Sequence, residues 1–108
     1  MSVVRILLLA VDAEREEEFV ELARLRSLQS ARLGVSRHQV YRLNADPEND
    51  APGTVTYLGA MEFESEEHLA RFNEAQEADQ ESQETIQRVR GSNGLATVRS
   101  ESFGVSID

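Results

Sequence analysis

The chain has 108 residues and a formal net charge of −9, and its length predicts one domain, residues 1–108, with one modest hydrophobic core. It contains no cysteine, and all eleven basic residues are arginines, which excludes disulfides, thiolate metal sites and lysine chemistry such as Schiff bases. The negative charge and the scattered arginines argue against nucleic acid and membranes as partners. No export signal is visible, so we expect a cytoplasmic protein.

The first half of the chain predicts a strand, a helix and two further strands. The run from Val3 to Val11 is almost wholly apolar, which is typical of a central strand buried on both faces. Asp12 is a candidate cap for a helix that should stop at Gly34. Strands over 35–43 and 54–63 flank a polar loop over 44–53, and the first of these strands carries His38.

The second half predicts one or two helices and a last strand. Ser65 caps a helix with apolar residues at Leu69 and Phe72. Residues 77–84 are almost entirely polar, so we expect the helix to break there or run exposed, with a short helix carrying Ile86 and Val89 after it. A turn over 91–94 leads to a strand over 95–103.

This order predicts an α+β fold of the ferredoxin-like type, βαββαβ, with a four-stranded antiparallel sheet and both helices on one face. The strands are apolar on both sides, so the other face would expose a large apolar patch if it stayed in water. We therefore expect a homodimer through that sheet face.

Two segments carry a resemblance to a known group of proteins. Glu18-Phe19 through Leu33-Gly34-Val-Ser-Arg-His38 is similar to an EthD-type helix and second strand, and Met61-Glu-Phe-Glu-Ser65 is similar to a strand-to-helix junction. The chain resembles the dimeric α+β barrel superfamily, which includes EthD-like proteins, the stress-responsive barrel family and antibiotic-biosynthesis monooxygenases. It departs at Ser27, where many EthD-like sequences have a histidine, and at the positions of the cyclase tyrosine and histidine, here Phe72 and Ala78.

The resemblance implies a protein that binds a small apolar metabolite, and an oxygenase or cyclase that acts without a cofactor on an aromatic or polyketide-like compound. The departures mean that the tyrosine–histidine cyclase mechanism does not transfer. One alternative is a non-catalytic dimer that binds a ligand or another protein, since fold does not fix function. A regulatory module of the ACT type is a third interpretation, although such modules normally accompany another domain.

His38 is the candidate catalytic residue, because an imidazole on a strand can take a proton from a phenol or an activated carbon. The alternative is a partly exposed strand residue or a hydrogen-bonded core histidine. A pocket between the helices and the sheet is expected over the face that bears Leu7, Leu9, Tyr57, Gly59 and Met61, with Gly59 leaving room for a ligand. The same residues also suit a filled core.

The candidate ligand-binding residues are Arg5, Tyr57, Gly59, Met61 and Phe72. Arg5 interrupts an apolar strand, so its charge needs a carboxylate, a ligand anion or water, and an internal salt bridge to a glutamate is the default expectation. Glu64 and His68 share a helical face, but the sequence offers no further ligands beside them, so no metal site is expected.

Overall fold

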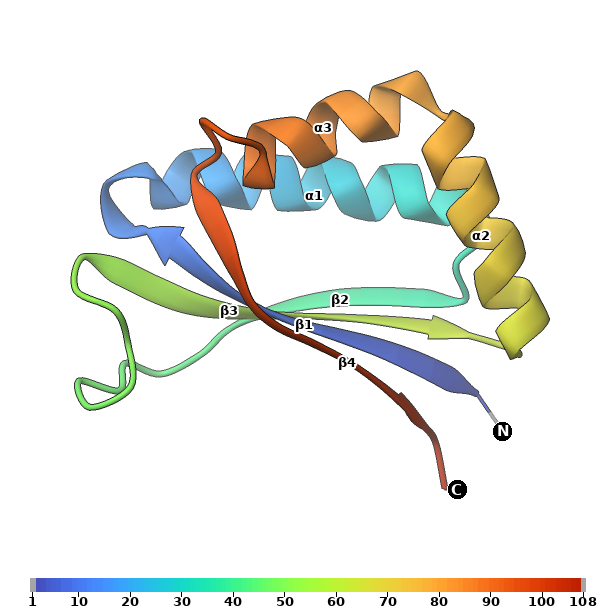
Figure 1. The fold of residues 1–108 in the computed structure, drawn as a ribbon, viewed down its shortest axis with the longest axis horizontal. Coiled ribbons are helices and arrows are strands. Elements are labelled where there is room, and N and C mark those ends of the chain that lie inside the picture. The colour runs from blue at the N-terminus through green and yellow to red at the C-terminus, as the bar shows by residue number, and fades with distance from the viewer. Residues whose placement is uncertain (1, 108) are drawn as a thin grey trace.

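The computed structural model describes residues 2–107 and forms one antiparallel sheet with helices on one side of it (Figure 1). The sheet order is β2-β3-β1-β4, which confirms the ferredoxin-like arrangement and the central position of the first strand. The elements are β1 (Val3–Asp12), a 3-10 helix (Ala13–Arg15), α1 (Glu16–Arg32), β2 (Arg37–Arg42), β3 (Thr54–Phe63), α2 (Glu66–Ala78), α3 (Gln80–Arg90) and β4 (Ala96–Val105).

The start of the first helix differs from the prediction. Asp12 caps only the short 3-10 turn, where its Oδ1 accepts a hydrogen bond of 3.0 Å from the backbone N–H of Glu14. The α-helix then begins at Glu16, with three glutamates in its first turn. Its end agrees with the prediction, because Gly34 has a φ of 99°, a left-handed conformation that glycine adopts without strain.

The predicted break within residues 77–84 and the further helix with Ile86 and Val89 are confirmed, but the break is shorter than expected. Helix α2 continues to Ala78, and a single extended residue, Asp79, separates it from α3. The side chain of Asp79 caps α3 by accepting hydrogen bonds from the backbone N–H of Ser82 (3.0 Å) and from its hydroxyl (2.6 Å). The polar residues that follow are helical because this cap satisfies the first turn and because Ser82 and Thr85 are buried.

The core under the helices is divided into two clusters. The larger cluster joins α1, α3 and one end of the sheet, and its buried members are Leu9, Val11, Phe19, Leu22, Tyr57, Val89, Leu95 and Ala96. The smaller cluster lies under α2, where Phe72 and Phe63 have ring centroids 5.1 Å apart, together with Val3 and Met61. The middle of the sheet, between these clusters, carries less completely buried residues.

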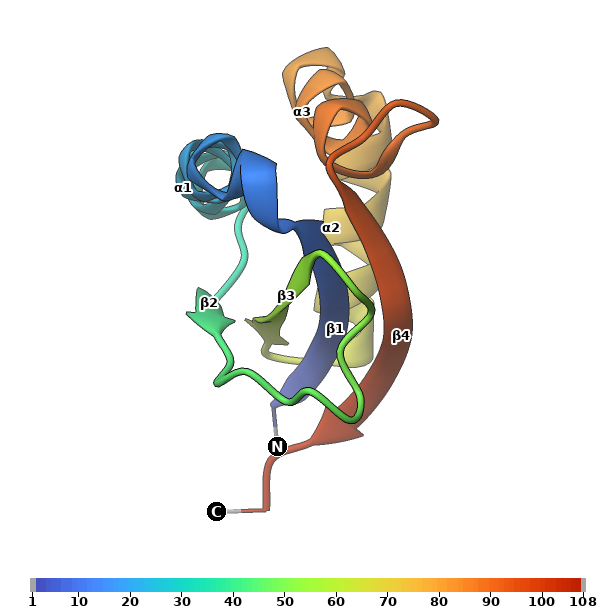
Figure 2. The same ribbon diagram turned by 90° about the vertical axis from the view of Figure 1, so that its left-hand side faces the viewer.

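The face of the sheet that the helices leave open is covered at one end by the loop between β2 and β3 (Figure 2). Arg99, which a β-bulge leaves without a partner in β1, donates a hydrogen bond of 2.9 Å to the carbonyl of Asn49. Asp50 accepts a hydrogen bond of 2.8 Å from the hydroxyl of Thr56. The rest of this outer face, with Ile6, Leu8 and their neighbours Val4, Leu58 and Ala60, has no helix over it.

Candidate functional site

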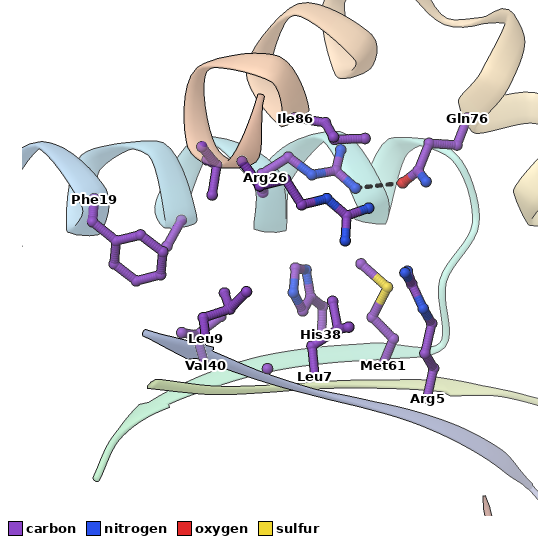
Figure 3. Close-up of a pocket in the computed structure, with 14 residues that line it drawn as sticks. Arg5, Leu7, Leu9, Phe19, Arg26, His38, Val40, Met61, Gln76 and Ile86 are labelled. Atoms are coloured by element: carbon purple, nitrogen blue, oxygen red, sulfur yellow. Dashed lines mark hydrogen bonds between the residues drawn. The ribbon is translucent and has the colours of Figure 1, made fainter. Parts of the chain in front are cut away.

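A pocket lies between the helices and the middle of the sheet, and residues from both core clusters contribute to its wall (Figure 3). Its cavity volume is about 90 Å³, and its mouth is open to solvent. The predicted pocket is therefore present, and Leu9, Phe19 and Met61 on its wall are at the same time buried members of the core. The lining consists of Arg5, Leu7, Leu9, Phe19, Ala23, Arg26, His38, Val40, Gly59, Met61, Gln76, Ile86, Val89 and Arg90.

His38 projects from β2 into this pocket, as Figure 3 shows. It faces the helices because it pairs with Met61 in the register of β2 and β3, and both residues belong to the helix-covered face. Its ring Nδ1 lies 2.8 Å from the hydroxyl oxygen of Ser30, a fully buried residue of α1. The sheet and α1 thus hold the imidazole from two sides.

Ser30 Oγ lies within hydrogen-bond distance of two groups, the backbone carbonyl of Ser27 at 3.1 Å and Nδ1 of His38 at 2.8 Å. The hydroxyl has one hydrogen, so the directions of these bonds depend on the tautomer of the imidazole. With the proton on Nδ1, His38 donates to Ser30 and Ser30 donates to Ser27; with the proton on Nε2, Ser30 donates to His38. Nε2 has no hydrogen-bond partner among residues 2–107. In the Nδ1–H tautomer, a neutral His38 presents a base to the pocket.

The surroundings of His38 keep it neutral. Burial, with the positive charges of Arg26 and Arg5, lowers its pKa to about 4. Imidazolium is disfavoured because it would be both partly desolvated and close to two guanidinium groups. At neutral pH the unprotonated form is thus almost the only one present.

Three arginines line the pocket, and they differ in their partners. Arg5 forms an ion pair with Glu101 of β4, with Nη2 and Oε2 2.6 Å apart, so the expected salt bridge to a glutamate is confirmed. Arg26 of α1 donates to two neutral side-chain oxygens, that of Gln29 at 3.1 Å and that of Gln76 on α2. Arg90, at the end of α3, makes no side-chain hydrogen bond or ion pair within residues 2–107.

Gly59 and Met61 both lie on the pocket wall. A Cβ atom added at Gly59 would meet no heavy atom within 4 Å, so this position faces open space. Gly59 pairs with Leu7 on one side and Val40 on the other, which places it at the centre of the pocket floor. The absence of a side chain here contributes to the volume of the pocket, as the sequence indicated.

Two other predicted ligand-binding residues lie outside this lining. The hydroxyl of Tyr57 donates to Glu16 Oε2 over 2.5 Å, and its ring packs on Phe19 with centroids 4.6 Å apart. Glu16 also accepts a bond of 2.6 Å from Arg42, and the hydrogen bonds from Arg42 and Tyr57 lower its pKa. Phe72, 2% exposed, is part of the smaller core cluster. Both aromatic residues therefore pack within the fold.

His68 is not among the residues that line the pocket, and it joins α2 to the end of α1. Its Nδ1 accepts a bond of 2.9 Å from the backbone N–H of Glu64, and its Nε2 is 2.7 Å from the carbonyl of Gly34. Within residues 2–107, no group of three or more histidine and carboxylate side chains is placed to hold a metal ion. In the same part of the chain, no helix has the length and apolarity needed to cross a bilayer.

Sequence reasoning missed Arg26, Arg90 and Ser30 as members of the site. A signal for Arg26 was present, because it lies seven residues after Phe19 and four after Leu22, on the helical face that carries the core. A charge on such a face needs a buried partner or a cavity. Ser30 lies four residues further on the same face, but its contact with His38 depends on how α1 packs against β2 and has no sequence signal.

Comparison with known proteins gives a likeness of fold alone. No protein-family model matches the sequence, and no curated protein sequence matches significantly. The solved structure of HapK from Hahella chejuensis superposes with a TM-score of 0.67 at 18% identity, covering 99% of this chain and 93% of HapK. An EthD family protein from Bacillus halodurans superposes with a TM-score of 0.56 at 16% identity, covering 97% of this chain and 99% of the chain of that protein.

A third structure has the same architecture. A dimeric ferredoxin-like protein from an uncultured marine organism superposes with a TM-score of 0.55 at 10% identity, covering 99% of this chain and 96% of that protein. The chain therefore shares its ferredoxin-like α+β fold with these proteins, among them an EthD family protein. The expectation of this fold is confirmed, and the chemistry has to be argued from the pocket itself.

Proposed function

We propose that this protein binds a small, largely apolar and aromatic metabolite in the pocket between the helices and the sheet, and that His38 acts there as a general base. The observation that carries this proposal is that His38 lines the pocket and that its Nε2 has no hydrogen-bond partner within residues 2–107. In the tautomer that we propose, Nδ1–H donates to Ser30 and Nε2 has the lone pair. The apolar wall formed by Leu7, Leu9 and Phe19 suits an aromatic ring.

The chemistry requires a proton transfer to His38, the return of that proton to the product, and no cofactor. Nε2 takes a proton from an acidic C–H or O–H of the ligand, and the electron pair left behind spreads onto a ligand oxygen as an enolate or phenolate. The guanidinium of Arg26 stabilises the anion, whose charge in turn raises the proton affinity of the nearby imidazole. In an oxygenase the carbanion form adds to dioxygen, one O–O bond order is lost as the C–O bond forms, and the resulting peroxide anion takes the proton back from the imidazolium as a hydroperoxide. In a cyclase it adds to a carbonyl carbon of the same molecule, and the alkoxide formed takes that proton.

A non-catalytic ligand-binding protein is the second candidate. The observation in its favour is the lowered pKa of His38, about 4, which makes the imidazole a weak base in the free protein. In this case the pocket holds the same kind of molecule, and His38 only accepts a hydrogen bond from it. Turnover distinguishes the two candidates, because only the enzyme has a proton-transfer rate that depends on His38.

We further propose that two copies pair through the outer face of the sheet and that the protein works in the cytosol. The apolar residues of the outer face that the β2–β3 loop leaves uncovered support the pairing. The absence of cysteine supports a reducing compartment.

The test uses anthrone deuterated at its acidic methylene carbon, because loss of deuterium to water reports proton abstraction without requiring oxygen. The parent protein is expected to accelerate the exchange, measured by NMR. His38→Ala should reduce the accelerated rate by about 10²-fold or more and still bind anthrone. Gly59→Leu should lose both binding and exchange, because a leucine side chain would occupy the centre of the pocket.

The matched control is His68→Ala, which removes the chain's other histidine at a distance from the pocket and should keep the exchange rate. Thermal unfolding of each variant shows that it is folded. If the parent binds anthrone without accelerating exchange, the catalytic proposal is wrong and the binding protein is supported. If His38→Ala exchanges as fast as the parent, another group is the base.

A further inference from the structure

The pocket lining has more arginine side chains than carboxylates paired with them. Arg5, Arg26 and Arg90 all line it, in a chain whose net charge is −9. Only Arg5 has a carboxylate partner there, Glu101. The three guanidinium groups also act on one another, since Arg90 and Arg5 lower the pKa of Arg26, whose burial is the larger cause of its fall to about 10.

The acidic side chains whose charges favour the charged forms of Arg26 and Arg90 already have partners. Asp79, which acts on Arg26, is bound to Arg32 at 2.8 Å and to Ser82, and Glu101, which acts on Arg90, is bound to Arg5. Within residues 2–107, neither Arg26 nor Arg90 has a carboxylate oxygen within 4.0 Å. Two partly buried cations therefore lie beside an apolar pocket without a counter-ion, an arrangement that costs free energy unless an anion enters.

The way Arg26 is held indicates a binding role. The oxygens of Gln29 and Gln76 fix the guanidinium between α1 and α2 but carry no charge, so they position it without neutralising it. Gln29 is 2% exposed and is itself fixed by a bond of 2.8 Å from its Nε2 to the hydroxyl of Thr85 on α3. A fixed, partly desolvated guanidinium binds carboxylates well, because little conformational entropy is lost.

We propose that Arg26 and Arg90 form a subsite for a carboxylate, so that the ligand is an aromatic acid whose ring lies on the apolar wall and whose carboxylate faces the helices. This inference rests on the proposed function, because it assumes that the pocket receives a ligand. It adds the chemical class of that ligand. In Figure 3, Arg26 lies on the helix side above His38, so an acid held there brings its ring between the two.

The experiment compares two probes of equal shape, 2-naphthoate and 2-naphthamide, in calorimetric titrations near neutral pH. The parent is expected to bind the acid about tenfold or more tightly than the amide. Arg26→Gln and Arg90→Gln should each remove most of this preference while leaving the affinity for the amide nearly unchanged. Arg90→Gln breaks no hydrogen bond within residues 2–107, so it remains informative if Arg26→Gln unfolds.

The matched controls are Arg24→Gln and Arg88→Gln, which remove exposed arginines from the same two helices and should keep the preference. This comparison corrects for any long-range effect of lowering the positive charge of the chain. Equal binding of acid and amide by the parent, or a preference that survives in both pocket variants, overturns the carboxylate subsite alone. A parent that binds neither probe overturns the ligand-binding function and this inference together.

Discussion

The proposed chemistry of the site depends on one serine. Ser30 has a single hydroxyl hydrogen, and when that hydrogen is donated to Ser27, Ser30 Oγ accepts from His38 Nδ1–H. The sequence predicted His38 as the candidate base because of its place on β2. It could not predict the tautomer, since Ser30 and His38 meet only through the packing of α1 on the sheet. Arg26 and Arg90 were missed for a related reason, because a scattered arginine carries no local sign of the cavity it lines.

The first prediction concerns the pH dependence of stability. Between pH 6.5 and about 4 the unfolded chain protonates this histidine, whereas the folded chain keeps it neutral beside Arg5 and Arg26. The free energy of unfolding should therefore decrease as the pH falls through that window, by up to about 3 kcal/mol from this group. His38→Gln should lack this component when both proteins are unfolded with urea from pH 7 to pH 4.

The other charged groups near His38 are Arg90 of α3 and Glu101 of β4, and they are present in both proteins. The difference between parent and variant thus isolates the histidine. A constant difference in unfolding free energy across this pH range would show that His38 is as easily protonated in the folded state as in the unfolded chain.

At the scale of the elements, the bounds of β3 were predicted in full, because alternating apolar residues end at the Ser65 cap. The path of the chain from α2 to α3 was not predicted in full. The polar run over 77–84 has no apolar periodicity that would predict a helix, yet Asp79 caps one, and Ser82 and Thr85 are buried in it. Buried polar side chains between helices hide an element from hydropathy patterns, which detect only apolar faces.

The second prediction is that Asp79→Asn destabilises the protein at neutral pH. The ion pair with Arg32 and the hydrogen bonds from Ser82 lower the pKa of Asp79 to about 2. Its contribution to stability is complete above the ordinary value of 3.8 and is lost as the pH falls toward 2. Parent and variant should therefore differ in melting temperature at pH 7 and converge at about pH 2.

A matched control for Asp79→Asn is Asp46→Asn, in the exposed β2–β3 loop and remote from the helices. This substitution should not alter the signal of the helices in the melting curves. Melting curves of the parent and Asp79→Asn that remain equally far apart at pH 7 and pH 2 would contradict the assignment of the lowered pKa to the cap.

On the scale of the whole molecule, the two faces of the sheet differ in what covers them. All three helices lie on one side, and the other side has only the β2–β3 loop at one end (Figure 1). The sequence predicted this difference from the order of the elements, because right-handed βαβ crossovers place both helices on one face of the sheet. It did not predict that the loop would cover part of the outer face, because this depends on Arg99, which the β-bulge in β4 leaves free to bind Asn49.

The third prediction is that the parent chain has the mass of two copies in dilute solution and that Ile6→Glu has the mass of one. Ile6 lies in the central strand on the outer face, so a carboxylate there would be buried without a partner in the dimer. Light scattering after gel filtration measures the mass.

The control is Leu28→Glu, which makes the same kind of change on α1 at a side chain that is 71% exposed. It should leave the mass unchanged. A parent chain that is monomeric at low concentration contradicts the pairing through the outer face. Loss of the dimer in both variants contradicts the placement of the dimer interface on that face.

The division of the core into two clusters has a thermodynamic consequence. The middle of the molecule lacks the continuous apolar packing that its two ends have, so a bound ligand would supply the missing contacts between them. Any compound that fits there should raise the melting temperature in proportion to the logarithm of its concentration once the site is saturated. Thermal shift screening of metabolite collections is thus a direct way to identify the natural ligand.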